Sequence, residues 1–224
     1  DLKPANVLFR TDGSAVLLDF GLSWHAHYPD LLAEQLRKAV GSPAWIAPEQ
    51  VVGVRGDPRS DIFAIGVMLY QLCTRELPFG EPQTPAGLRQ RLWMDPPPPR
   101  KVNPDVPTWL QEVVLRCLEP EAVKRYPSAA HLAFDLMHPT QVQITERGTN
   151  VTGTHEQDQI TVFQQAWQCI AQVTRVLDQD RINLAARANR ASQRARIGSR
   201  NRSFTGRVDL GQNQHIDACQ HARA

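Results

Sequence analysis

The order of apolar and polar residues over the first 138 positions predicts two short strands followed by a series of helices. The apolar stretches 6–9 and 15–20 have strand length, and the Asp-Gly pair in the intervening RTDGS segment is typical of a hairpin turn. Residues 60–74 (SDIFAIGVMLYQLCT) are apolar on nearly every side. This pattern predicts a helix that is the most buried element of the fold.

Two further stretches, 84–94 and 107–120, have apolar residues at the three- and four-residue spacing of amphipathic helices. A third amphipathic run follows Arg125 within 124–136, with Pro127 suited to its first turn. The proline run DPPPPR at 95–100 lies between the first two. It is predicted to be a stiff linker, which we favour over a ligand for a proline-recognition domain.

Composition changes near Pro139. Residues 1–138 carry 14 Lys and Arg against 16 Asp and Glu, a net of −2, whereas residues 139–224 carry 11 Arg against 7 acids, a net of +4. A linker is predicted from 139, then a helix near 160–184. We favour a single helix that packs on the preceding lobe over a short coiled coil. The Arg-rich stretch 181–207 is predicted to be a disordered basic tail, with no nucleic acid as a specific partner.

Other features of composition narrow the class of protein. No apolar run approaches 18 residues, so no transmembrane segment is predicted. The four cysteines form no CxxC pair, which argues against a zinc ribbon or a disulfide framework and favours a reducing, cytoplasmic location. The sequence gives no indication of the oligomeric state.

The predicted hairpin brings together side chains that carry chemistry: Asp1, Lys3, Asn6 and Asp19 converge at one of its ends. Oxygen ligands beside a cation suit Mg²⁺ and phosphate better than zinc. By themselves, these residues fit a solvated hairpin with turn aspartates and a capping Asn equally well.

Motifs further along favour the first interpretation. The triplet DFG lies at 19–21, GSPAWIAPE at 41–49, and Asp61, Gly66 and Arg125 follow in order. Together with Asp1, Lys3 and Asn6, these residues resemble the second half of the eukaryotic-type protein kinase domain, in its Ser/Thr branch. The resemblance covers about residues 1–138. It implies the mainly α-helical C-terminal lobe of the α+β kinase fold, with a small β-hairpin.

The resemblance also implies roles for individual residues. Asp1 would orient or accept the proton of a substrate hydroxyl, and Lys3 would neutralise the γ-phosphoryl group of ATP. Asn6 and Asp19 would hold Mg²⁺. The Ser42 hydroxyl would bond Asp1 and Lys3 and shape the acceptor site.

Five further residues have implied structural roles. Phe20 would pack inward, and Trp45 takes the place of the usual Tyr. Glu49 and Arg125 would form a buried ion pair. Asp61 would brace the backbone of the catalytic loop. An Asp at the start of a helix also fits a cap and a partner of the helix dipole, and both roles can hold together.

The segment 19–49 contains few hydroxyl groups for phosphorylation, since Ser23 lies beside the DFG triplet and Tyr28 is a weak candidate. Control by phosphorylation of this segment is therefore not favoured. His25 and His27 have no neighbouring cysteine and are predicted to lie on a loop surface rather than to bind a metal.

In the resembled family the catalytic-loop Asp follows His-Arg, and a Gly-rich loop and a phosphate-holding Lys come earlier. The chain opens at that Asp and is interpreted as a fragment without the N-terminal lobe. We expect the parent protein to transfer the ATP γ-phosphoryl group to Ser or Thr of a protein substrate, and the fragment alone to be inactive. The alternative is a pseudokinase-like module that binds proteins without catalysis.

Overall fold

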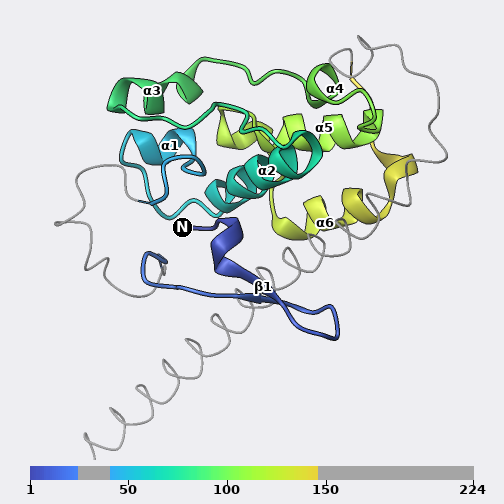
Figure 1. Ribbon diagram of the computed structural model, residues 1–224, viewed down its shortest axis with the longest axis horizontal. Coiled ribbons are helices and arrows are strands. Elements are labelled where there is room, and N and C mark those ends of the chain that lie inside the picture. Colours follow the sequence, from blue (N-terminus) through green and yellow to red (C-terminus); the bar gives the residue numbers. More distant parts are fainter. Residues whose placement is uncertain (25–40, 146–224) are drawn as a thin grey trace, which may run out of the picture. The chain divides into compact units, whose positions relative to one another are not determined.

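A computed structural model of the chain describes residues 1–24 and 41–145, which belong to one compact unit (Figure 1). Within these residues, one two-stranded sheet precedes a group of helices, as predicted. The strands are β1 (Val7–Phe9) and β2 (Ala15–Leu17). The helices are α1 (Pro48–Val51), α2 (Arg59–Thr74), α3 (Pro85–Arg89), α4 (Pro99–Val102), α5 (Thr108–Cys117) and α6 (Ala129–Met137). Short 3₁₀ helices are η1 (Pro4–Asn6), η2 (Gln90–Leu92), η3 (Ala122–Lys124) and η4 (Pro139–Gln141).

The hairpin turns at the predicted Asp-Gly pair. Gly13 has a φ of 80°, a left-handed conformation that glycine adopts without strain, and the Asp12 carboxylate accepts a hydrogen bond from the Ser14 N–H. The strands are antiparallel, with Val7 opposite Leu17. The second strand is shorter than the predicted 15–20, because Asp19 has a φ of 58° and its backbone leaves the extended conformation.

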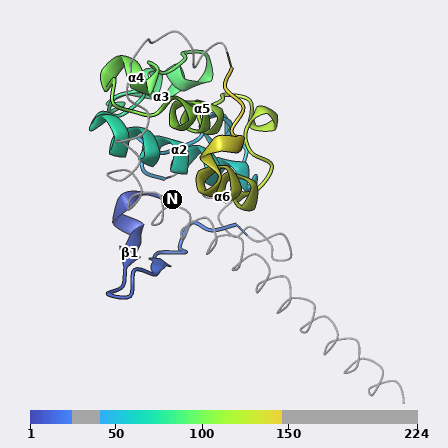
Figure 2. The same cartoon turned by 90° about the vertical axis from the view of Figure 1, so that its right-hand side faces the viewer.

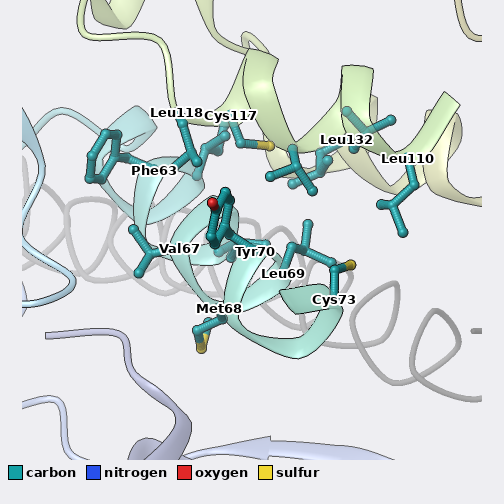
Figure 3. Close-up of a cluster of buried hydrophobic side chains, with 14 of the residues drawn as sticks. Phe63, Val67, Met68, Leu69, Tyr70, Cys73, Leu110, Cys117, Leu118 and Leu132 are labelled. Atoms are coloured by element: carbon teal, nitrogen blue, oxygen red, sulfur yellow. The ribbon is translucent and has the colours of Figure 1, made fainter. Parts of the chain in front are cut away.

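The helix α2 lies at the centre of the core, and twelve of its sixteen residues are buried, as the apolar pattern predicted. It packs against α5, and the two helices lie side by side in both ribbon views (Figures 1 and 2). Figure 3 shows the side chains between them, among them Phe63, Tyr70, Leu110 and Leu118. The burial of these apolar side chains stabilises the lobe.

Gly66 permits the close approach of α2 and α5. A Cβ atom placed on Gly66 would lie 2.6 Å from the Cys117 Cβ and 3.3 Å from the Cys117 carbonyl carbon. The second distance involves backbone, which cannot move aside as a flexible side chain can. Any larger residue at position 66 therefore forces the two helices apart.

Polar side chains end α2 at its predicted position. The Thr74 hydroxyl donates to the Tyr70 carbonyl at 2.8 Å, and the Asn103 amide donates to the Cys73 carbonyl at 2.8 Å. Arg75 follows in the left-handed conformation, with a φ of 63°. The Asn103 contact satisfies the Cys73 carbonyl, one of the groups that the end of a helix otherwise leaves without a partner.

Two of the predicted segments differ from the structure. The helix expected over 84–94 is divided into α3 and η2, and the proline run 95–100 is more than a linker, because Pro99 begins α4. Proline suits the first position of a helix, where its missing N–H is not needed. The helix predicted at 107–120 corresponds to α5 and is shorter than expected, and the amphipathic run predicted after Arg125 corresponds to α6.

The residues beyond the expected boundary at Pro139 are described only as far as 145. Val142 packs against the core, and the Thr145 hydroxyl donates to the Glu112 carboxylate at 2.8 Å. The helix predicted near 160–184 and the Arg-rich tail lie outside the described residues, and the division at 138 stays a prediction. In the described ranges, no helix has the length and apolar character needed to cross a membrane.

Candidate active site

Three of the predicted site residues are in direct contact. The Lys3 ammonium donates to the Asp1 carboxylate at 2.7 Å and to the Ser42 hydroxyl at 2.7 Å. The Ser42 backbone N–H donates to the other Asp1 carboxylate oxygen at 2.6 Å. The hydroxyl thus contacts Lys3 as expected, whereas Asp1 is bound by the Ser42 backbone rather than by its hydroxyl.

Asn6 lies behind this group and is buried. Its side-chain amide donates to the Asp1 backbone carbonyl at 2.8 Å, so the amide oxygen faces away from that contact. The Leu18 N–H donates to the Asn6 carbonyl at 2.9 Å, which places Asp19 one residue beyond the cross-strand partner of Asn6. The exposed Asp19 carboxylate accepts a hydrogen bond from the Gly21 N–H at 3.2 Å.

The inward packing expected for Phe20 is wrong, because its side chain is 57% exposed. The left-handed backbone at Asp19 is followed by a turn in which the Ser23 N–H donates to the Phe20 carbonyl at 3.0 Å. This turn takes Phe20 away from the helical core. Further along, Trp24 lies against Gly56, where an added Cβ would come within 2.7 Å of the indole ring.

The ion pair between Glu49 and Arg125 is present as predicted. Two guanidinium nitrogens of Arg125 donate to the two Glu49 carboxylate oxygens, each at 2.8 Å. The Ser60 hydroxyl adds a 2.6 Å hydrogen bond to Glu49, a partner that the sequence analysis did not identify. The pair connects α1 with the start of α2 and with the loop before α6. It therefore fixes the chain at Glu49, the far end of the segment that begins at Ser42.

These contacts predict how the stability of the chain depends on pH. Burial alone would raise the pKa of Glu49, but the hydrogen bonds from Arg125 and Ser60 outweigh it and hold the pKa below its usual value of 4.5. A lowered carboxyl pKa in the folded state contributes stability above the unfolded-state pKa, and this stability is lost as the pH falls through the folded-state pKa. We expect the free energy of unfolding to fall steadily below about pH 4.5.

Urea titrations of the 224-residue chain at pH values from about 6 to about 3 measure this dependence. Other acids also contribute, so the Glu49→Gln variant serves as the reference. Its unfolding free energy should change less steeply with pH than that of the original chain. Equal slopes for the two proteins would contradict the assignment to Glu49.

Asp61 lies in the first turn of α2, where a carboxylate favours the helix dipole, and its contact with the catalytic-loop backbone stays a prediction. The Asp57 carboxylate accepts from the Arg59 N–H at 2.9 Å and also binds the Arg59 guanidinium at 2.7 Å. Trp45 is half-buried and packs against the core. The histidines at 25 and 27 and Tyr28 lie outside the described residues.

Arg91, to which no sequence pattern pointed, is buried and reaches the segment after Ser42. Its guanidinium donates to the Ala44 carbonyl at 3.4 Å and to the Ile46 carbonyl. A single Arg in an amphipathic stretch is usually a surface residue, so no local signal distinguished it.

Comparison with known proteins agrees with this geometry. Residues 1–137 match the protein kinase domain family. The chain is 38% identical over 161 residues to the serine/threonine-protein kinase Pkn1 of Myxococcus xanthus, covering 68% of this chain and 23% of that protein. It is 32% identical over 137 residues to the serine/threonine-protein kinase PknB of Mycolicibacterium smegmatis, a match that covers 61% of this chain and 22% of that protein.

A third relative is the DNA damage-responsive serine/threonine-protein kinase RqkA of Deinococcus radiodurans, 37% identical over 139 residues, with 59% of this chain and 20% of that protein covered. The chain spans about a fifth of the length of the curated relatives that it matches. The family match covers more than half of the chain, along the residues that form the hairpin, the site and the helices. The chain belongs to the protein kinase family.

Proposed function

We propose that this chain is the catalytic-loop and substrate-binding part of a protein serine/threonine kinase. The observation that carries the proposal is the direct contact of Asp1, Lys3 and Ser42, from positions up to 41 residues apart. Phosphoryl transfer to a protein hydroxyl uses a carboxylate that accepts the hydroxyl proton and cations that offset the phosphoryl charge, and the contact places such a carboxylate beside such a cation. The names of the relatives support the Ser/Thr class.

Asp1 would accept the proton of the substrate Ser or Thr hydroxyl as its oxygen forms a bond to the γ-phosphorus of ATP and the bond to the ADP oxygen breaks. The Lys3 ammonium would offset the negative charge of the transferred group. Ser42 holds Lys3 with its hydroxyl and Asp1 with its N–H, so one residue fixes the spacing of the other two. Such positioning accounts for much of the rate in phosphoryl transfer.

Asn6 and Asp19 would hold Mg²⁺, which neutralises phosphate charge when bound. Their amide and carboxylate oxygens are the hard donors that Mg²⁺ prefers, and this ion usually takes only one or two protein carboxylates together with substrate phosphates. The structure fits this preference, because the amide nitrogen of Asn6 is already engaged by the Asp1 carbonyl. In the described residues, no group of three or more His, Cys, Asp and Glu side chains forms a complete metal cage.

Transfer of labelled phosphate from ATP to a generic basic protein tests the proposal in two forms of the protein. The first is the 224-residue chain, whose sequence contains no G-x-G-x-x-G loop to cover the phosphates. The second is the same chain joined to the N-terminal lobe of a relative. We expect no measurable transfer from the first form and clear transfer from the second.

The Asp19→Ala variant of the joined form is the control, since it removes a proposed Mg²⁺ ligand without altering the helices. Transfer by the 224-residue chain that disappears in its Asp19→Ala variant would overturn the expected inactivity. A folded but inactive joined protein would instead favour the alternative, a pseudokinase-like module that binds proteins without phosphorylating them.

A further inference from the structure

Arg91 is one of the most deeply buried side chains in the described residues, only 1% exposed, although it carries a charge. It lies in η2 and extends toward the segment that follows Ser42. One guanidinium nitrogen donates to the carbonyls of Ala44 and Ile46. The guanidinium also lies over the Phe79 ring, 5.5 Å from its centroid.

No acidic side chain of the described residues pairs with Arg91, and its Nε and second Nη atoms have no hydrogen-bond partner there. Burial without a carboxylate lowers the pKa of the guanidinium to about 10. An unpaired buried cation opposes folding, and an apolar side chain of similar length would avoid that cost. The stability of the lobe alone therefore gives no reason for an Arg at this position.

What Arg91 does provide is a pair of hydrogen bonds to one short stretch of backbone. The two carbonyls flank Trp45, and the Trp45 N–H in turn donates to the Ser42 carbonyl at 3.0 Å. Arg91 thus holds the stretch 42–46 at its middle. Ser42 fixes one end of this stretch to the candidate active site, and Glu49 fixes the chain just beyond its other end to Arg125.

The two buried arginines are linked by aromatic rings. Arg91 lies over Phe79, Phe79 stacks on Phe63 with centroids 5.9 Å apart, and Arg125 lies 5.0 Å from the Phe63 centroid. This packing holds both guanidinium groups against the core, so the Arg91 side chain has little freedom to move away from the two carbonyls.

We propose that Arg91 is a positioning residue for the protein substrate: it holds residues 42–46 in the conformation over which the acceptor-bearing segment binds. The proposal rests on the proposed kinase function for its catalytic consequence. Its structural part, that Arg91 restrains this stretch at some cost in stability, stands independently. The site of action is the backbone beside Ser42, not the ATP phosphates, so substrate binding should depend on Arg91 and ATP binding should not.

The Arg91→Met variant tests both parts, because Met keeps the length of the stem and removes the charge and the donors. In the 224-residue chain, hydrogen exchange followed by mass spectrometry should show faster exchange in a peptide covering 42–47, about tenfold or more, as expected for losing hydrogen bonds to a charged group. The melting temperature should change little or rise, because removing the unpaired buried cation offsets the loss of its two hydrogen bonds to carbonyls. In the active joined protein, the KM for the protein substrate should rise about tenfold or more, with the KM for ATP and kcat little changed.

Arg100→Met is the matched control. Arg100 is also buried and also donates to a backbone carbonyl, that of Val106, but this contact lies between α4 and α5. It should leave exchange at 42–47 and the protein-substrate KM unchanged. Arg91→Lys should fall between Arg91→Met and the original protein, because an ammonium group can still reach one carbonyl but lacks the planar fork.

An unchanged rate of hydrogen exchange at 42–47 in Arg91→Met overturns the proposal. The proposal is also overturned if Arg91→Met melts at a lower temperature and raises the KM for ATP as much as the KM for protein, because Arg91 would then have a purely structural role. If the joined protein has no activity, the proposed function fails, and the exchange and melting measurements still decide whether Arg91 restrains this stretch. If Arg91→Met does not fold, a comparison of Arg91→Lys with the original chain decides the same question.

Discussion

Replacing Arg125 with Met in the 224-residue chain is expected to lower the free energy of unfolding by about 3–5 kcal/mol, the usual cost of removing one partner from a buried ion pair. Arg125 is 2% exposed and binds Glu49 through two hydrogen bonds. It also donates to the carbonyls of Arg59, Glu119 and Pro120. The variant leaves a carboxylate and three carbonyls without their cation. Since domains are stable by about 5–15 kcal/mol, a large part of the stability is lost.

Urea unfolding followed by circular dichroism measures the change, and Arg59→Met provides the comparison. Arg59 binds Asp57 at 2.7 Å, but it is 30% exposed, so its ion pair is worth at most about 1 kcal/mol. The double variant Glu49→Gln, Arg125→Met should recover part of the loss, because the stranded charge is gone. Similar small losses for Arg125→Met and Arg59→Met would show that the buried pair does not stabilise the lobe.

The elements predicted well are those that one physical pattern specifies. The helix α2 is apolar on nearly every side and is buried on nearly every side. The Asp-Gly pair specifies the turn of the hairpin, because few residues adopt the left-handed angle found at Gly13. The pairing of Glu49 with Arg125 is different. The two residues are 76 positions apart, and no local pattern joins them. Only the order of motifs shared with a known family could bring them together.

The errors have a common cause, since each depends on backbone angles or on a tertiary neighbour. The strand expected over 15–20 ends early because Asp19 is left-handed, and the same turn leaves Phe20 exposed. Arg91 was missed because its acceptors are backbone carbonyls some 45 positions away, which no residue type signals.

In the candidate site, too, some contacts follow from local sequence and others depend on distant residues. Asp1 and Lys3 are two residues apart and their contact follows from local sequence, whereas Ser42 reaches them from 39 positions beyond Lys3. The resemblance placed Ser42 in the site, and the structure shows that its backbone as well as its hydroxyl takes part. Holding a carboxylate by a backbone N–H makes the contact insensitive to the side chain at position 42.

Replacing Asp1 with Asn in the joined, active protein is expected to reduce phosphoryl transfer by about 10²–10⁴-fold, the usual contribution of a positioned proton acceptor. Asn has nearly the same shape and can still accept the Ser42 N–H, so the loop should keep its conformation. What is lost is the negative charge that holds Lys3 and takes up the proton of the substrate hydroxyl. The loss should therefore appear in kcat, with the KM for ATP changed much less.

Two further variants make this result specific to the carboxylate of Asp1. Ser42→Ala removes an acceptor for Lys3 but keeps the backbone N–H to Asp1, so its loss should be smaller, about 10- to 100-fold. Asp12→Asn changes an exposed carboxylate of the hairpin turn, and transfer should stay at the original rate. Initial rates of labelled-phosphate transfer, with melting curves as a check on folding, order the three variants. A folded Asp1→Asn protein that keeps more than about a tenth of the original rate would exclude Asp1 as the proton acceptor, since the expected loss is at least about 10²-fold.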